Sequence, residues 1–315
     1  AQPMAALPAS LVAASLLEGK ISARGVLAMF IAVAAFSLMD ALLKVFAAYY
    51  PPMQVTAMRA GASLPFVFLP LIWAGRLSDL RPSRLGFHLL RALLGVVMLI
   101  TFVYALRSAS LASVYSVYMA APLLVAALAA WWLAEKVDAG RWLAIVVGFV
   151  GVLIILQPRP DGMSLWTGVA AAVSALCYAF VVLTARVLAR TETSSSMVCT
   201  YLVVVLLIAG AFAASGWVAI RSSDWGLLVV AGGLGWVGQH YITEAFRHSP
   251  AAVVAPIEYT AILWGILIDW AVWTVLPNGT MLWGAGLVIA AGVYVAWREN
   301  RSHGTLATQA EADQR

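Results

Sequence analysis

Charged side chains are scarce in this sequence, and that scarcity excludes most classes of protein. Asp, Glu, Lys and Arg make up 10% of the 315 residues, apolar residues make up 63%, and the mean hydropathy is +0.93. An ordinary soluble chain has about 25% charged and about 45–50% apolar residues. The composition therefore excludes a soluble globular protein and a disordered one. It predicts an all-α integral membrane protein that is embedded over almost its whole length.

Sequence motifs of soluble catalysis are also absent. Gly19 and Lys20 are followed by Ile21 and lack the earlier glycine of a phosphate-binding loop, and neither H-E-x-x-H nor G-x-S-x-G occurs. We therefore expect no ATP hydrolysis, no cofactor and no metal, and an intramembrane enzyme stays only a remote alternative. The two cysteines, Cys177 and Cys199, lie in apolar stretches and are predicted to be small core residues that form no disulfide framework.

Apolar runs of about 20 residues predict ten membrane spans. Arg, Pro, Gly and Asp clusters separate them, as in ordinary turns. The amino-terminal residues 1–20 have no basic residue ahead of their apolar run, so we expect a segment lying on the membrane and not a secretory signal. The predicted spans are residues 25–46, 54–75, 87–106, 110–133, 141–157, 164–188, 196–217, 225–246, 250–274 and 280–298.

The few basic residues fix an orientation for these spans. Most of the 19 Lys and Arg residues fall on one side of the predicted membrane, while Lys44, Arg107, Arg159 and Arg221 fall on the other and Arg59 lies inside a span. Basic residues concentrate in cytoplasmic loops. We therefore expect an inner-membrane protein with both termini in the cytoplasm. The net charge of +5 and the pI of about 9.4 are then an orientation signal, and no nucleic-acid binding is expected.

The two halves of the chain repeat each other. When the sequence is shifted by about 140 residues, Gly95 and Arg107 meet Gly235 and Arg247. Each half has five spans, an odd number, so the second copy enters the membrane upside down. An inverted repeat is the geometric basis of alternating access. The predicted units are an N-terminal interfacial segment (1–24), a first repeat (25–158), a second, inverted repeat (159–298) and a cytoplasmic tail (299–315).

The stretch Tyr104–Pro160 resembles the signature of the EamA-type branch of the drug/metabolite transporter superfamily. It has a span with a central Pro122, then the acidic-basic pair Glu135 and Lys136, then a Gly-rich span that ends in a Pro-containing loop. The resemblance covers nearly the whole chain, from Gly25 to Trp297. The second copy departs from the signature, since Val275 and Leu276 stand where the first copy has the charged pair.

This resemblance implies a secondary transporter of small metabolites. We expect export of amino acids, as in the aromatic amino-acid and methyl-viologen exporter type, and uptake of riboflavin or S-adenosylmethionine is the alternative. The expected partners are a small-molecule substrate and membrane lipid. The oligomeric state is left open, with a monomer as one option. Spans one to four and six to nine are implied to line the path.

Polar residues inside spans are costly and mark candidate sites. Glu258 is the most isolated carboxylate, and its repeat partner is Tyr118. Asp40 either forms a local ion pair with Lys44, four residues later, or lines the cavity. Arg59 either binds a substrate carboxylate or pairs with Asp40 or a carbonyl. The predicted substrate-binding residues are Glu258, His240, Gln239, Trp236, Tyr118, Tyr115, Asp40, Ser37, Arg59, Tyr178 and Tyr259, and the predicted helix kinks are at Pro122 and Pro256.

The driving force stays open at this point. A simple facilitator and proton exchange through Glu258, His240 or Asp40 both fit the sequence, because His titrates near neutral pH and buried carboxylates carry protons in many transporters. The glycines of the eighth predicted span, residues 225–246, are explained by close helix packing.

Overall fold

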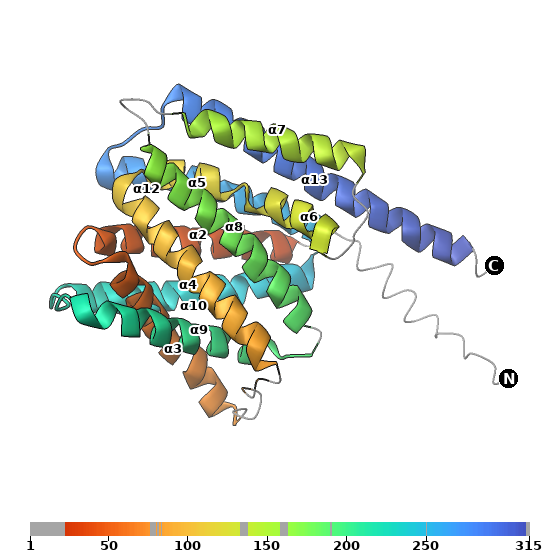
Figure 1. Ribbon diagram of the computed structural model, residues 1–315. Coiled ribbons are helices and arrows are strands. Elements are labelled where there is room, and N and C mark those ends of the chain that lie inside the picture. Colours follow the sequence, from red (N-terminus) through yellow and green to blue (C-terminus); the bar gives the residue numbers. More distant parts are fainter. Residues whose placement is uncertain are drawn as a thin grey trace.

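A computed structural model describes residues 23–312, apart from residues 76–79, 81, 83, 133–137, 158–162, 190 and 250. Every regular element in this part of the chain is a helix (Figure 1). The elements are α2 (Ala23–Ala47), α3 (Pro52–Trp73), α4 (Leu85–Ser108), α5 (Leu111–Tyr118), α6 (Ala121–Trp132), α7 (Ala139–Ile155), α8 (Leu165–Leu188), α9 (Ser194–Ala213), η2 (Ala214–Gly216), α10 (Asp224–His248), α11 (Ala251–Val254), η3 (Ala255–Thr260), α12 (Ala261–Trp273) and α13 (Gly279–Ala312).

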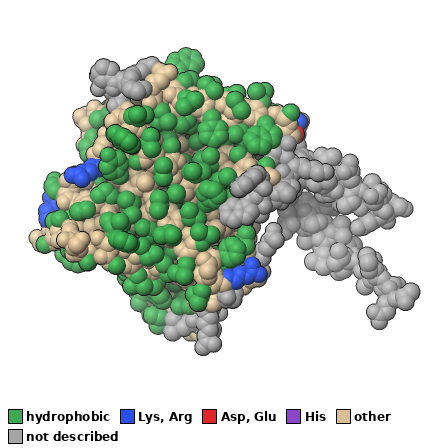
Figure 2. Space-filling model, viewed as in Figure 1, with side chains coloured by type: hydrophobic (Ala, Val, Ile, Leu, Met, Phe, Trp, Pro, Cys, Tyr) green, Lys and Arg blue, Asp and Glu red, His purple; other side chains and the backbone are tan. Residues whose placement is uncertain are grey.

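Helices long and apolar enough to cross a membrane dominate the described chain. There are 8 such segments, and α7 is a shorter apolar helix of 17 residues. The helix α10 has 25 residues but is less apolar, because glycines and polar side chains interrupt it. Apolar side chains cover most of the face shown in Figure 2. The chain is thus a multi-pass membrane protein, and the count of ten spans stays a prediction.

Two of the predicted spans are broken inside the membrane. The predicted span 110–133 consists of α5 and α6, and the predicted span 250–274 consists of α11, η3 and α12. Pro122 is the second residue of α6, and its ring would clash with the carbonyl of Tyr118, where α5 ends. Pro256 is the second residue of η3. The α-helix is therefore interrupted close to both prolines, by a turn at residues 119–120 and by the 3₁₀-helix η3.

Helices of the two sequence halves interleave. The most extensive packing joins α2 with α10, α4 with α8, α3 with α9 and α7 with α13, and α5 packs on α12. Figure 1 shows α7 and α13 side by side along one edge, with α4 and α8 crossing the middle of the view. Each pair joins a helix before residue 156 to one after residue 164. The halves therefore share one core and do not form separate bundles.

Small residues permit the closest of these contacts. A Cβ added to Gly151 of α7 would lie 2.7 Å from the carbonyl oxygen of Gly284 on α13, and a Cβ on Gly232 of α10 would overlap the carbonyl of Ala62 on α3. Glycine at these positions allows the backbones to touch. Gly232 belongs to the glycine group for which packing was predicted.

The last helix runs past the predicted start of the cytoplasmic tail. The helix α13 continues beyond Arg298 to Ala312, so no break in the helix marks that boundary. The predicted interfacial segment falls almost wholly on residues 1–22, which lie outside the described residues. Cys177 and Cys199 are buried and free, which confirms them as core residues.

Candidate functional site: a cavity with charged and aromatic walls

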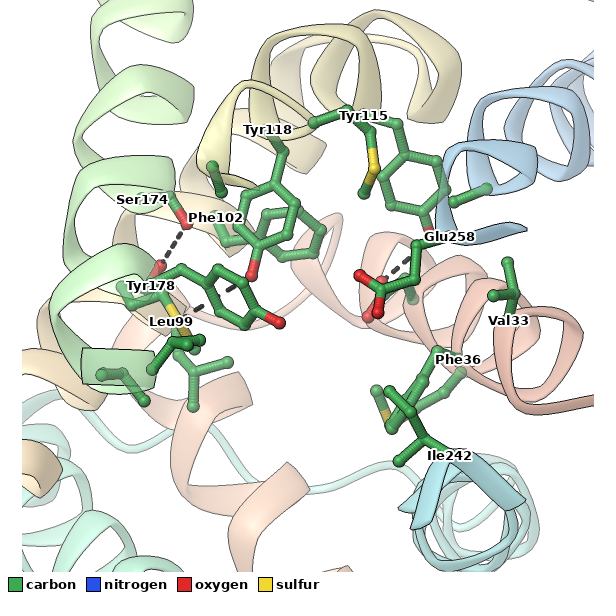
Figure 3. A pocket seen from close by; sticks show the side chains of 18 of the residues that line it. Val33, Phe36, Leu99, Phe102, Tyr115, Tyr118, Ser174, Tyr178, Ile242 and Glu258 are labelled. Atoms are coloured by element: carbon green, nitrogen blue, oxygen red, sulfur yellow. Dashed lines mark hydrogen bonds between the residues drawn. The ribbon is translucent and has the colours of Figure 1, made fainter. Parts of the chain in front are cut away.

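A cavity of about 370 Å³ lies among the helices of both halves. Its lining residues come from α2, α3, α4, α5, α6, α8, α10, η3 and α12, and Figure 3 shows several of them. The volume is in the range of small-molecule sites, about 300–1,000 Å³. Nine of the predicted residues line it: Ser37, Asp40, Arg59, Tyr115, Tyr118, Pro122, Tyr178, Gln239 and Glu258.

Asp40 of α2 is held by α5 and not by its neighbour on the same helix. The hydroxyl of Tyr115 donates a hydrogen bond to Oδ2 of Asp40 over 2.9 Å. Lys44 instead forms an ion pair with Asp269 of α12 at 2.9 Å and lies over the ring of Trp273. The local pair between Asp40 and Lys44 therefore does not form, because a buried carboxylate from another helix takes the lysine. This leaves Asp40 at the cavity wall.

Glu258 projects into the cavity from the 3₁₀-helix η3. In Figure 3 its carboxylate points into the open space, near Tyr115 and across from Tyr178. Within the described part of the chain, no hydrogen bond or ion pair engages this carboxylate. A buried carboxylate without a partner is costly. The structure therefore keeps Glu258 available to a group that enters the cavity.

Aromatic rings form one continuous part of the wall. The ring of Tyr118 packs against Phe102 and Tyr178, with centroids 5.2 Å and 5.3 Å apart, and Phe102 stacks on Tyr115 at 6.3 Å. Figure 3 shows the Tyr118 and Tyr178 rings beside the same open space as Glu258. Packed rings supply a rigid apolar surface with polar hydroxyl groups at its edge.

Two arginines line the same cavity, Arg59 from α3 and Arg91 from α4. Arg91 donates to the carbonyl oxygen of Met197 over 3.2 Å, and its guanidinium lies over the ring of Tyr201. The Nε atoms of both arginines are buried without a hydrogen-bond partner among the described residues. Arg91 was not predicted as a site residue. It lies inside the predicted span 87–106, so the rule that selected Arg59 would also have selected it.

Four predicted residues do not line this cavity. Trp236 and His240 lie on an exposed face of α10 with their rings stacked at 5.5 Å. Adjacent helical residues point about 100° apart, so α10 can turn Gln239 to the cavity and His240 away from it. Tyr259 is buried against Gly292 of α13. Trp236, His240 and Tyr259 thus lie outside the lining of this cavity, and Pro256 lies where the α-helix gives way to η3, as predicted for a helix kink.

Polar side chains pair with each other at one end of the bundle, which we call the Tyr50 end. The hydroxyl of Tyr50, between α2 and α3, donates to Oδ2 of Asp224 over 2.6 Å, and Nε of Arg221 donates to the same oxygen over 2.9 Å. This hydrogen bonding by Asp224 raises the pKa of Arg221 above its ordinary value. The Gln54 amide donates to the carbonyl of Val218 and accepts from its N–H, over 2.6 Å and 2.9 Å.

Asp269 completes the polar layer at the Tyr50 end. Its Oδ1 pairs with Lys44, and its Oδ2 accepts a hydrogen bond from the backbone N–H of Ala112 over 2.8 Å. One buried carboxylate thereby joins α2, α5 and α12. Asp269 is not among the predicted site residues, although it stands in the apolar predicted span 250–274.

The opposite end, which we call the His88 end, holds a different buried cluster. Nε2 of His88 on α4 lies 3.4 Å from Oε1 of Glu192, and both side chains are buried. The backbone N–H of Arg84 and the hydroxyl of Ser196 donate to the two oxygens of Glu192, each over 3.1 Å. Arg91 stands three residues after His88. The cavity lining therefore reaches almost to this end.

Comparisons with known proteins show that this chain is similar to transporters. Residues 23–157 match the EamA-like transporter family. A riboflavin transporter of Brucella anthropi is 29% identical over 234 residues, which cover 72% of this chain and 82% of that protein. The pseudopaline exporter CntI of Pseudomonas aeruginosa is 28% identical over 271 residues, 85% of this chain and 94% of that protein. Residues 23–157 are therefore EamA-like, and the relatives that match most of the chain are transporters.

Further relatives of the transporter differ in solute and direction. An S-adenosylmethionine uptake transporter of Rickettsia felis is 25% identical over 238 residues, 75% of this chain and 80% of that protein. A solved crystal structure with 21% identity covers 88% of this chain and 98% of its own, with a TM-score of 0.63, and supports the fold alone. These names do not single out the amino-acid exporter type. They support a transporter of small metabolites.

Proposed function

We propose that this EamA-like transporter exports small metabolites that carry both an amino and a carboxylate group, with amino acids as the first candidates. The observation that carries the proposal is the lining of the cavity. Carboxylates from α2 and η3, arginines from α3 and α4, and a wall of tyrosine and phenylalanine rings face one space. Complementary charged groups beside an apolar surface suit an amino acid with a large side chain.

The interleaved helices support alternating access. An inverted repeat would make α2 equivalent to α8 and α4 equivalent to α10, so the packing of α2 on α10 would repeat as the packing of α8 on α4. Both pairs are among the most extensive contacts. An exchange between two such equivalent arrangements would open the cavity to either side of the membrane in turn.

The two ends of the bundle suggest which state the structure represents. Buried polar contacts join the helices at the Tyr50 end, and the cavity lining reaches towards Arg91 and Ala185 near the His88 end. With both termini in the cytoplasm of a bacterial inner membrane, the His88 end faces inward. We therefore propose an inward-facing state, with proton exchange through Glu258 or Asp40 as the driving force.

Uptake of riboflavin or S-adenosylmethionine is the second candidate, and the names of two relatives favour it. Riboflavin lacks a charged amino group, so Glu258 would then have no cationic partner. The arginines and the aromatic wall would still contact the solute. The choice between L-phenylalanine and riboflavin therefore separates the two candidates, whereas S-adenosylmethionine, which carries both an amino and a carboxylate group, is separated by the direction of transport.

Flux in proteoliposomes tests both candidates. Purified protein is reconstituted, and movement of labelled L-phenylalanine, riboflavin and S-adenosylmethionine is followed with and without a pH gradient, against protein-free vesicles. We expect saturable flux of unmodified L-phenylalanine that exceeds riboflavin flux. Flux of riboflavin or S-adenosylmethionine alone would replace amino-acid export with the second candidate, and chemical conversion without flux would reject a transporter.

A further inference from the structure

The charged groups of the cavity fall into two sets on different helices. The carboxylates of Asp40 and Glu258 come from α2 and η3, whereas the guanidinium groups of Arg59 and Arg91 come from α3 and α4. In the described part of the chain, no direct ion pair joins the two sets. The cavity therefore presents separate positive and negative groups to whatever enters it.

The two arginines line the cavity from neighbouring helices. Arg59 of α3 and Arg91 of α4 line the same cavity, and α3 packs against α4. The guanidinium of Arg91 also lies 5.0 Å from the centroid of the Tyr201 ring of α9. The ring of Tyr201 itself packs on Gly95 of α4. Two neighbouring helices thus bring Arg59 and Arg91 to one cavity, although their positions in the sequence differ by 32 residues.

Most hydrogen-bonding capacity of these arginines is unused. A guanidinium has five N–H donors, and the described structure gives Arg91 one acceptor, the carbonyl of Met197. The Nε atoms of Arg59 and Arg91 are buried and unpartnered. Asp40 could have neutralised Arg59, yet its Oδ2 accepts from Tyr115 and no ion pair forms. Two partly buried cations without an anion are costly, and an incoming anionic group would lower that cost.

We infer that Arg59 and Arg91 form an anion subsite that binds a carboxylate of the transported solute, while Glu258 binds its cationic group. The planar fork of donors on each guanidinium matches the two oxygens of a carboxylate. The inference rests on the proposed function and deepens it, because it names the groups that select the two ends of the solute. Arg91, at the His88 end of the cavity, is the residue it adds to the site.

Binding of three matched compounds tests the subsite without any membrane. L-phenylalanine carries both groups, 2-phenylethylamine lacks the carboxylate, and 3-phenylpropionate lacks the amine. Affinities are measured by calorimetry on detergent-purified protein. We expect the wild-type protein to bind L-phenylalanine most tightly. Arg59→Gln and Arg91→Gln should each weaken binding of L-phenylalanine and 3-phenylpropionate by about tenfold to a hundredfold and leave 2-phenylethylamine unchanged.

Two sets of controls keep this result interpretable. Arg107→Gln removes an exposed arginine from the same helix as Arg91 and should change none of the affinities. Arg59→Lys and Arg91→Lys keep the charge but lose the fork, so they should fold like the wild type and recover part of the affinity for L-phenylalanine. Melting temperatures of all variants are measured beside the affinities.

Three binding results would contradict the anion subsite. An equal loss for all three compounds, no loss in either arginine variant, or no binding of L-phenylalanine to the wild type would overturn the anion subsite. Failure of the proposed function looks different. In that case the binding pattern holds while vesicles show no flux, whereas L-phenylalanine flux that survives Arg91→Gln keeps the function and rejects the subsite.

Discussion

Ionisable side chains at the Tyr50 end are paired with one another, whereas those in the cavity face open space. Lys44 and Asp269 are in contact at 2.9 Å, and Asp269 also accepts a backbone hydrogen bond. Glu258 and Arg59 line the cavity without an ion pair in the described structure. Both kinds of residue are costly in a membrane. This difference indicates two roles for charged residues. The paired ones at the Tyr50 end hold helices together, and the unpaired ones in the cavity are available to bind a solute.

Removal of a partner at the Tyr50 end should have the largest effect on stability. Asp269→Asn leaves Lys44 charged and mostly buried, and breaking a buried pair in this way costs about 3–5 kcal/mol. We expect a clear drop in the melting temperature of the purified protein in detergent, measured by loss of monodisperse protein on heating. The double variant Lys44→Met, Asp269→Leu should regain much of that loss, since it removes both charges together.

A matched control separates this result from a general effect of losing a carboxylate. Asp138 pairs with Arg298 at 2.9 Å, but both side chains are about two-fifths exposed, at 41% and 43%. The hydrogen bond from Arg298 holds the pKa of Asp138 below its ordinary value, so the pair is ionised at neutral pH. Asp138→Asn should leave the melting temperature nearly unchanged, because exposed pairs contribute little. Equal losses in Asp138→Asn and Asp269→Asn would break the comparison.

The smallest effect is expected on the exposed face of α10. His240 stacks on Trp236 outside the cavity, so His240→Ala should leave both the flux of L-phenylalanine and its dependence on pH unchanged. Gln239, the adjacent residue, lines the cavity, and Gln239→Ala should lower flux. Flux measured across a pH series separates them. A loss of pH dependence in His240→Ala would return this histidine to the transport path.

Much of the candidate site could be predicted from the sequence because one physical rule covers it. Polar residues in apolar runs are costly, and this rule alone selects Asp40, Arg59 and Glu258, all of which line the cavity. The two prolines in predicted spans likewise predicted where the α-helices are interrupted, near residues 120 and 256. The predicted resemblance to EamA-like transporters is confirmed over residues 23–157.

What the sequence could not predict is which helix supplies each partner. The spacing of Asp40 and Lys44 allows an ion pair on one helix face, but Asp269 takes the lysine from a position 225 residues away. The position of His240 was ambiguous for a similar reason. Helical periodicity shows which residues share a face of α10, but it does not show which face the neighbouring helices turn towards the cavity. Arg91 was not predicted as a site residue because it was counted among the cytoplasmic basic residues that set the orientation, although it lies inside the predicted span 87–106.

Flux and stability of the Glu258→Gln variant test the central claim most directly. L-phenylalanine flux in proteoliposomes and the melting temperature are measured beside Glu244→Gln, whose carboxylate pairs with Arg247 near the surface. We predict that Glu258→Gln lowers flux at least about tenfold, as expected for a lost charge-assisted contact, with a melting temperature at or above the wild-type value. Wild-type flux in Glu258→Gln, or a loss of flux that merely follows a fall in melting temperature, would contradict the account.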